Sequence, residues 1–117
     1  MPFDDTTARS TPEIALLDKV RDLLATPDKW CKYALEHDRR HCVYGALNLA
    51  HHNVAMWTLG TNTKAYTNVE RALARETGRN HDILLDIILF NNAPDTKHAD
   101  ILALIDRARD RLLAEVG

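Results

Sequence analysis

The sequence is poor in cysteine, glycine, proline and tryptophan, and it has almost no excess of charge of either sign. Its 117 residues include two cysteines, four glycines, four prolines and two tryptophans, and its formal net charge at pH 7 is −2. No internal repeat or low-complexity segment is visible. A net charge of −2 creates no strong field that would attract nucleic acid or an anionic membrane. We therefore expect neither of them as a partner.

Long apolar runs are missing as well. The most apolar stretch, residues 83–90, is interrupted by Asp86 and is far too short to span a bilayer. Residues 1–10 are polar and acidic, without the basic start and apolar segment of a secretory signal, and we expect them to form a flexible tail. These features favour a cytoplasmic location, in which Cys31 and Cys42 are expected to be reduced thiols.

What the sequence does contain is typical of a globular helical protein. Hydrophobic residues make up 45% of the chain and charged residues 27%, and a chain of this length fits one domain with its own core. Apolar residues recur at helical spacing, and no segment alternates as a half-buried strand would. We predict an all-α fold, in which residues 11–117 form a compact single-domain bundle of five to six helices around a buried central helix.

Capping residues indicate where the first helices begin. Thr11 followed by Pro12 is typical of a helix start, and the same pattern at residues 26–28 predicts a short second helix to about residue 36. Asp38 is the candidate cap of a third helix. Gly45 lies inside this third helix, where glycine costs about 1 kcal/mol relative to alanine. This cost indicates that another element approaches closely there.

The second half of the chain has similar signals. The capping box at residues 67–70 predicts the start of a helix that ends at Gly78. Asn80 is the expected cap of the next helix, residues 82–90, whose apolar side chains surround almost its whole circumference. Such a helix is expected to be central and buried. Thr96 is the expected cap of the last helix.

Two patches of the chain are similar to a known family. The first consists of residues 30–35 (WCKYAL) and 40–47 (RHCVYGAL), and the second consists of residues 88–96 (ILFNNAPDT) and 98–108 (HADILALIDRA). They resemble small bacterial and phage proteins catalogued as domain of unknown function family 6197. His41 stands where an aromatic residue usually precedes the cysteine, and Phe90-Asn91-Asn92 stands where Trp-Asn-Asp is usual. The resemblance implies kinship and a shared fold, and it implies no activity.

A cluster of cysteines and histidines is the candidate metal site. It consists of Cys31, His37, His41 and Cys42. Zinc prefers this ligand set, so zinc is the one cofactor that the sequence suggests. The spacing matches no standard finger, and two core thiols with two surface histidines are the favoured interpretation. Cys42 is also a candidate nucleophile with His37 or His41 as its base, but its position on an apolar helix face favours core packing.

The candidate binding residues lie in a turn and among the aromatic residues. Asn91, Asn92 and Asp95 precede a helix N-terminus, where free backbone amides can bind an anion. Shaping the turn and capping the helix is the competing and favoured role of these side chains. Trp30 and Tyr44 are candidates for the rim of a binding surface, because aromatic residues often anchor interfaces; core packing is again the alternative.

The charges of the last helix do not form a track for phosphates. Arg107, Arg109 and Arg111 alternate with Asp106 and Asp110, which is typical of a solvated helix face. We therefore predict a small helical interaction module without catalytic machinery, which binds another protein, a second copy of itself or a small ligand. The alternatives are a metal-binding or thiol-dependent protein that uses the cysteine–histidine cluster, and a weak nucleic-acid binder.

Overall fold

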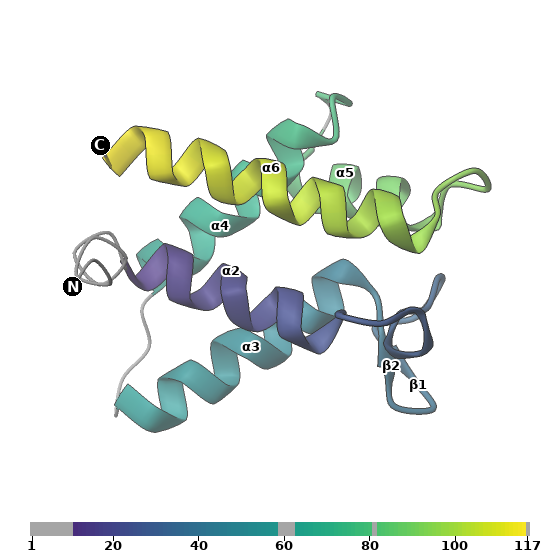
Figure 1. Ribbon diagram of the computed structural model, residues 1–117, viewed down its shortest axis with the longest axis horizontal. Helices are drawn as coiled ribbons and strands as arrows, with labels where there is room; N and C mark the ends of the chain where they lie inside the picture. Colours follow the sequence, from purple (N-terminus) through teal and green to yellow (C-terminus); the bar gives the residue numbers. More distant parts are fainter. Residues whose placement is uncertain (1–10, 59–62, 81, 117) are drawn as a thin grey trace.

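The computed structural model describes residues 11–58, 63–80 and 82–116, so the tail predicted for residues 1–10 lies outside the described residues. In chain order the elements are α2 (Pro12–Leu23), the 3₁₀-helix η1 (Pro27–Lys29), β1 (Glu36–His37), β2 (Arg40–His41), α3 (Val43–Thr58), α4 (Thr63–Glu76), α5 (Ile83–Asn92) and α6 (His98–Val116) (Figure 1). The predicted all-α class is confirmed. The strands of the described part are limited to the short antiparallel pair β1–β2.

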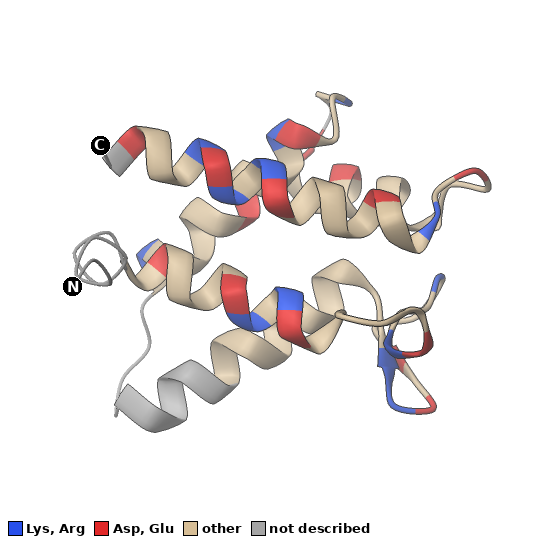
Figure 2. Cartoon of the chain, in the orientation of Figure 1, with Lys and Arg blue, Asp and Glu red and all other residues tan. Residues whose placement is uncertain are grey.

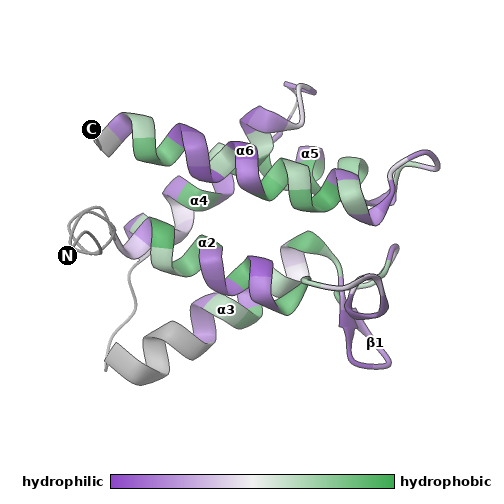
Figure 3. Ribbon diagram, viewed as in Figure 1, coloured by the Kyte–Doolittle hydropathy of each residue, from purple (hydrophilic) through white to green (hydrophobic). Residues whose placement is uncertain are grey.

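The helices form a bundle in which α2 and α6 run antiparallel beside each other (Figure 1). α3 packs against α2, and α4 packs against both α6 and α2. α5 lies on α3 and α4. Hydrophilic and hydrophobic residues alternate along α2 and α6, as expected for helices with one buried face (Figure 3).

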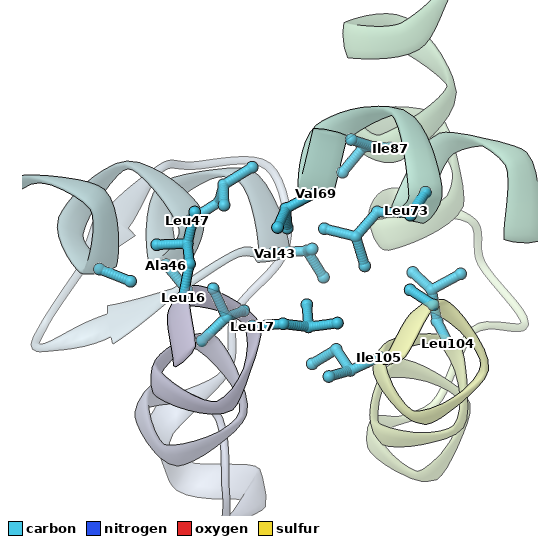
Figure 4. Packing of buried hydrophobic residues seen from close by; sticks show 14 of the residues in the cluster. Leu16, Leu17, Val43, Ala46, Leu47, Val69, Leu73, Ile87, Leu104 and Ile105 are labelled. Atoms are coloured by element: carbon cyan, nitrogen blue, oxygen red, sulfur yellow. The ribbon is translucent and has the colours of Figure 1, made fainter. Parts of the chain in front are cut away.

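Aliphatic side chains from all five α-helices meet in the centre of the bundle (Figure 4). Among the completely buried ones are Leu17, Leu47, Leu73, Ile87 and Leu104. Each of them contributes roughly 1.5–3 kcal/mol by leaving water. Since these residues come from every α-helix, the core holds the whole bundle together.

Acidic and basic residues are interspersed along α2 and α6 (Figure 2), and ion pairs join the outer faces of the helices. Between α2 and α6, Arg21 binds Asp106 and Arg109 binds Asp18, each at an N–O distance of 2.8 Å. The carboxylate of Glu76 on α4 forms ion pairs with the other two arginines of α6, Arg111 at 2.7 Å and Arg107 at 3.4 Å. The sequence predicted these arginines on a solvated helix face. The arginines of α6 therefore remain partly exposed, but their guanidinium groups bind carboxylates of neighbouring helices.

Two of the predicted helix ends are confirmed. Thr11 caps α2, because its hydroxyl oxygen accepts from the Ile14 backbone amide at 3.2 Å. Gly78 follows the end of α4 with a φ of +74°, the left-handed conformation that glycine adopts most easily. The predicted start of this helix was wrong: α4 begins at Thr63, so Thr67 lies inside it.

The caps predicted for the last two helices were also wrong. Asp82, and not Asn80, caps α5, because its carboxylate accepts from the Leu85 amide. Thr96 does not cap α6, because its hydroxyl donates to the carbonyl of Phe90 at 2.7 Å. The Asp100 carboxylate instead accepts from the Lys97 amide at the start of α6.

The short helix predicted after residue 26 is absent from the structure. A single 3₁₀ turn, η1, is followed by extended chain and by the β1–β2 hairpin, in which Glu36 pairs with His41. Asp38 and Arg39 form the hairpin turn with φ values of +51° and +67°, as two-residue hairpin turns require. Asp38 is therefore no helix cap; α3 begins at Val43 instead.

The predicted burial of the apolar helix was wrong in part. α5 inserts Ile87 into the core, but Leu84, Leu85 and Leu89 are exposed. With ten residues in α5 and a bundle of this size, neighbouring helices cover one face only. The bundle therefore has no fully enclosed central helix among its described elements.

Candidate functional site

The buried side chain of Asn91 holds the loop of residues 30–42 on the C-terminal end of α5. Its Oδ1 atom accepts from the indole Nε1 of Trp30 at 2.8 Å and from the backbone amide of Val43 at 3.0 Å. Its Nδ2 atom donates to the carbonyl of Cys31 at 3.1 Å. One amide group therefore connects the start of the loop, the start of α3 and the end of α5.

The residues after Asn91 extend this contact. The Oδ1 atom of Asn92 accepts from the backbone amide of Tyr33 at 2.8 Å, and the ammonium of Lys32 donates to the carbonyl of Ala93 at 2.5 Å. The same ammonium lies 5.6 Å from the centre of the Trp30 ring, within the range of a cation–π contact. Three of the predicted binding residues, Trp30, Asn91 and Asn92, are thus brought together, and here they anchor a loop.

The other two predicted binding residues lie elsewhere. Tyr44 is on α3, where its hydroxyl is 3.1 Å from that of Tyr66, which donates to Asn48 at 2.7 Å. Burial, followed by the bond to Tyr44, raises the pKa of Tyr66 far above its usual range. Asp95 is exposed at the edge of a separate cavity of about 360 Å³. The structure does not join Tyr44 or Asp95 to the Asn91 contacts.

The structure places the cysteine–histidine cluster around the hairpin. Cys42 is buried and its sulfur accepts from the Gly45 amide at 3.3 Å, while Cys31 is half-buried. His37 is exposed beside Asp38, and His41 is half-buried. Within the part of the chain that the structure describes, no three His, Cys, Asp or Glu side chains gather as a metal site would require.

Gly45 explains how the loop lies so close to α3. A Cβ atom at this position would lie 2.1 Å from the carbonyl oxygen of Leu35. The close approach predicted from this glycine is therefore confirmed, and the approaching element is the loop backbone. Contact through the backbone leaves the side chain of Leu35 53% exposed.

An apolar surface extends from α5 onto this loop, and we call it the α5–loop surface. Its exposed residues are Tyr33, Leu35, Leu84, Leu85 and Leu89. A hollow of about 200 Å³ lies where the two parts meet, lined by Tyr33, Leu35, Ile88 and Asn92 among others. This surface could not be recognised in the sequence, because apolar residues around almost the whole circumference of α5 predict a helix buried in the core.

Comparison with known proteins gives kinship alone. In the described residues, no helix has both the length and the apolar character needed to cross a membrane. No curated protein and no solved structure matches the chain. The pattern of one protein family matches residues 8–111, which is most of the sequence. The chain therefore belongs to the family of unknown function DUF6197.

Proposed function

We propose that this protein is an interaction module that pairs with a second copy of itself through the α5–loop surface. The observation that carries this proposal is the exposure of large apolar side chains on α5. Leu84 and Leu89 are each 40% exposed, and Leu85 is 45% exposed. Contiguous exposed apolar groups of this kind mark interaction sites on soluble proteins more often than single exposed residues do.

The spacing of these residues fits a helix as the binding partner. Leu84 and Ile88 form one row along α5, and Leu85 and Leu89 form a second row beside it. Rows of residues four apart create the ridges that interdigitate when two helices cross at about −50°. The row pattern of a second α5 matches the first, because a two-fold axis presents the same surface on both subunits.

The polar ends of α5 favour an antiparallel arrangement of two copies. The N-terminal end carries the exposed carboxylate of Asp82, and Lys32 lies at the C-terminal end, beside Ala93. An antiparallel pair brings each Asp82 toward the Lys32 of the other copy and opposes the two helix dipoles favourably. The exposed rings and methyl groups of Tyr33 and Leu35 then extend the apolar contact beyond the helix.

The paired function needs no catalytic group. Cys42 caps α3 within the core, and the Asn91 amide has its hydrogen bonds within the fold. The four arginines described above bind carboxylates on neighbouring helices, which leaves no uncompensated basic track for nucleic acid on α6. These contacts support an interaction module over a thiol-dependent enzyme and a nucleic-acid binder.

Sedimentation equilibrium of the full chain tests this proposal. We expect a concentration-dependent mass that approaches twice 13.3 kDa. Leu85→Glu places a charge in the centre of the apolar rows and should weaken the pairing at least about tenfold, because burying an unpaired charge is unfavourable. Ala114→Glu is the matched control, since it adds the same charge to an exposed position of α6.

Three results would count against the proposed pairing. The first is a wild-type chain that remains a monomer up to about 1 mM, the concentration at which a free energy of about −4 kcal/mol would give half pairing. The second is a dimer that Leu85→Glu does not weaken. The third is a dimer that Ala114→Glu weakens equally, which would place the interface on another face.

A further inference from the structure

The two cysteines of the chain lie on neighbouring backbone segments. The backbone amide of Cys31 donates to the carbonyl of His41 at 3.0 Å, and Trp30 pairs with His41 in a parallel β-bridge. The residue that follows on each segment is a cysteine, so Cys31 and Cys42 continue this parallel register. Paired backbone segments lie about 5 Å apart, which is within the Cα separation that a disulfide spans.

We propose that Cys31 and Cys42 form an oxidation site, in which the two thiols join in a reversible intramolecular disulfide. Both are free thiols in the structure, and the chain has no other cysteine. Cys31 is half-buried and Cys42 is buried, but Cys42 also lines the hollow of the α5–loop surface. This arrangement gives Cys31 the better access to an external oxidant and Cys42 the position of the resolving thiol.

The contacts of both sulfur atoms are compatible with the bond. The Cys42 sulfur accepts from the Gly45 amide at 3.3 Å, a role that a disulfide sulfur retains. The Cys31 thiol donates only a weak bond, 3.6 Å long, to the carbonyl of Ala34. Burial, and next the nearness of Cys42, raise the pKa of the Cys31 thiol.

Glutathione disulfide is a suitable oxidant for this step. The Cys31 thiolate attacks one of its sulfurs, the Cys31–glutathione bond forms, and one glutathione thiolate leaves. The Cys42 thiolate then attacks the Cys31 sulfur, the Cys31–Cys42 bond forms, and the second glutathione leaves. Two protein thiols are oxidised, one glutathione disulfide is reduced to two glutathione molecules, and the leaving thiolates take up the two protons.

The bond would close the loop that carries part of the α5–loop surface. Tyr33 and Leu35 lie between the two cysteines, and the Leu35 backbone contacts α3 at Gly45. A cross-link between residues 31 and 42 lowers the conformational entropy of the less ordered states of this loop, and it therefore favours the ordered conformation. Oxidation would thus fix the apolar side chains of the loop in place next to α5.

The test is to incubate the folded full chain with glutathione disulfide and to measure its intact mass and its non-reduced peptide map. We expect a mass decrease of about 2 Da, the loss of two hydrogen atoms, and a Cys31–Cys42 peptide that a dithiol reductant cleaves. Cys42→Ser should stop at the Cys31–glutathione adduct, a gain of roughly 305 Da. Serine is a favoured helix cap, so this variant keeps an acceptor at the start of α3. Cys31→Ser should remain unmodified.

Two outcomes would overturn the proposal. In one, the wild-type chain accumulates a stable glutathione adduct at Cys31 while Cys42 stays free. In the other, the oxidised cysteines join two chains, so that the cross-linked species has twice the mass. The Leu85→Glu variant separates this inference from the proposed pairing, because a monomeric chain should form the same intramolecular disulfide.

Discussion

The helical bundle and the loop of residues 30–42 are stabilised by different interactions. The bundle has aliphatic side chains from five helices in its core, so its free energy of unfolding is spread over many residues. In the segment from Ala25 to His41, no residue is fully buried. The loop instead depends on hydrogen bonds to Asn91, Asn92 and Ala93, so a single amide side chain can decide whether it stays in place.

α5 belongs to both regions, and this explains its unusual composition. Its inner face places Ile87 in the core, and its C-terminal end places Asn91 under the loop. Its outer face carries the exposed leucines of the α5–loop surface. One ten-residue helix therefore connects the core, the loop and the proposed interface.

Leu17→Ala is expected to have the largest effect, because it removes a completely buried side chain from the centre of the bundle. The free energy of unfolding should fall by roughly 2–5 kcal/mol, as lost transfer energy and the new cavity add together. Urea titration followed by circular dichroism measures this change. Leu85→Ala is the matched control, and in dilute solution it should change stability by less than about 0.5 kcal/mol. Equal effects of the two variants would contradict the assignment of Leu85 to the surface.

The contrast between the buried Leu17 and the exposed Leu85 shows how much of the fold could be predicted from the sequence. Helical periodicity predicted the presence of α2, α3 and α6 correctly, although not every end of them, because their apolar residues form one stripe. In α5 the stripe is lost, since Leu84, Leu85 and Leu89 are apolar without being covered. Periodicity cannot distinguish a residue that packs in the core from one that is kept apolar for another reason, so the α5–loop surface could not be found from the pattern.

The conformation of the loop of residues 30–42 could not be predicted from the sequence, for a different reason. Its conformation depends on long-range bonds, such as the one between Trp30 and Asn91, that no local pattern encodes. Tyr33, Asp38 and Arg39 have positive φ values, which are uncommon for residues other than glycine. Since no glycine stands at these positions, the sequence did not indicate a hairpin turn there. Gly45 was the one local signal, because a glycine inside a helix predicted the close approach that the Leu35 backbone makes.

Asn91→Ala should detach the loop and leave the bundle folded. It leaves the indole Nε1 of Trp30 and the amide of Val43 without their acceptor, at a cost of roughly 2–3 kcal/mol. Hydrogen exchange measured by NMR should show rapid exchange of the Trp30 indole proton and slow exchange in α2 and α6. Local opening of this kind differs from global unfolding, in which all amides exchange together.

Asn92→Ala provides the control for this local effect. It removes the acceptor of the Tyr33 amide, which is exposed to water, and one of the two acceptors of the Asn91 Nδ2 atom, whose bond to the Cys31 carbonyl remains. It leaves the bonds of Asn91 to Trp30 and Val43 intact. We expect a loss of under about 1 kcal/mol and an indole proton that remains protected. If Asn91→Ala accelerates exchange in α2 and α6 as much as in the loop, the two regions unfold as one unit and the contrast between them fails.

The smallest effect should come from the ion pairs on the outside of the bundle. The hydrogen bond from Arg21 lowers the pKa of Asp106 below its ordinary value of 3.8. As the pH falls through this value, the unfolded chain binds a proton before the folded chain does, so the stabilisation present at neutral pH is lost in acid. Asp106→Asn cannot titrate, and between about pH 7 and pH 3 its unfolding free energy should fall less than that of the wild type. Water screens this half-exposed pair, so the difference should be under about 1 kcal/mol.

Urea midpoints at both pH values measure this difference in unfolding free energy, with Asp110→Asn as the control on an exposed residue of the same helix. An acid dependence equal to that of the wild type would show that the bundle gains nothing from the Arg21–Asp106 pair.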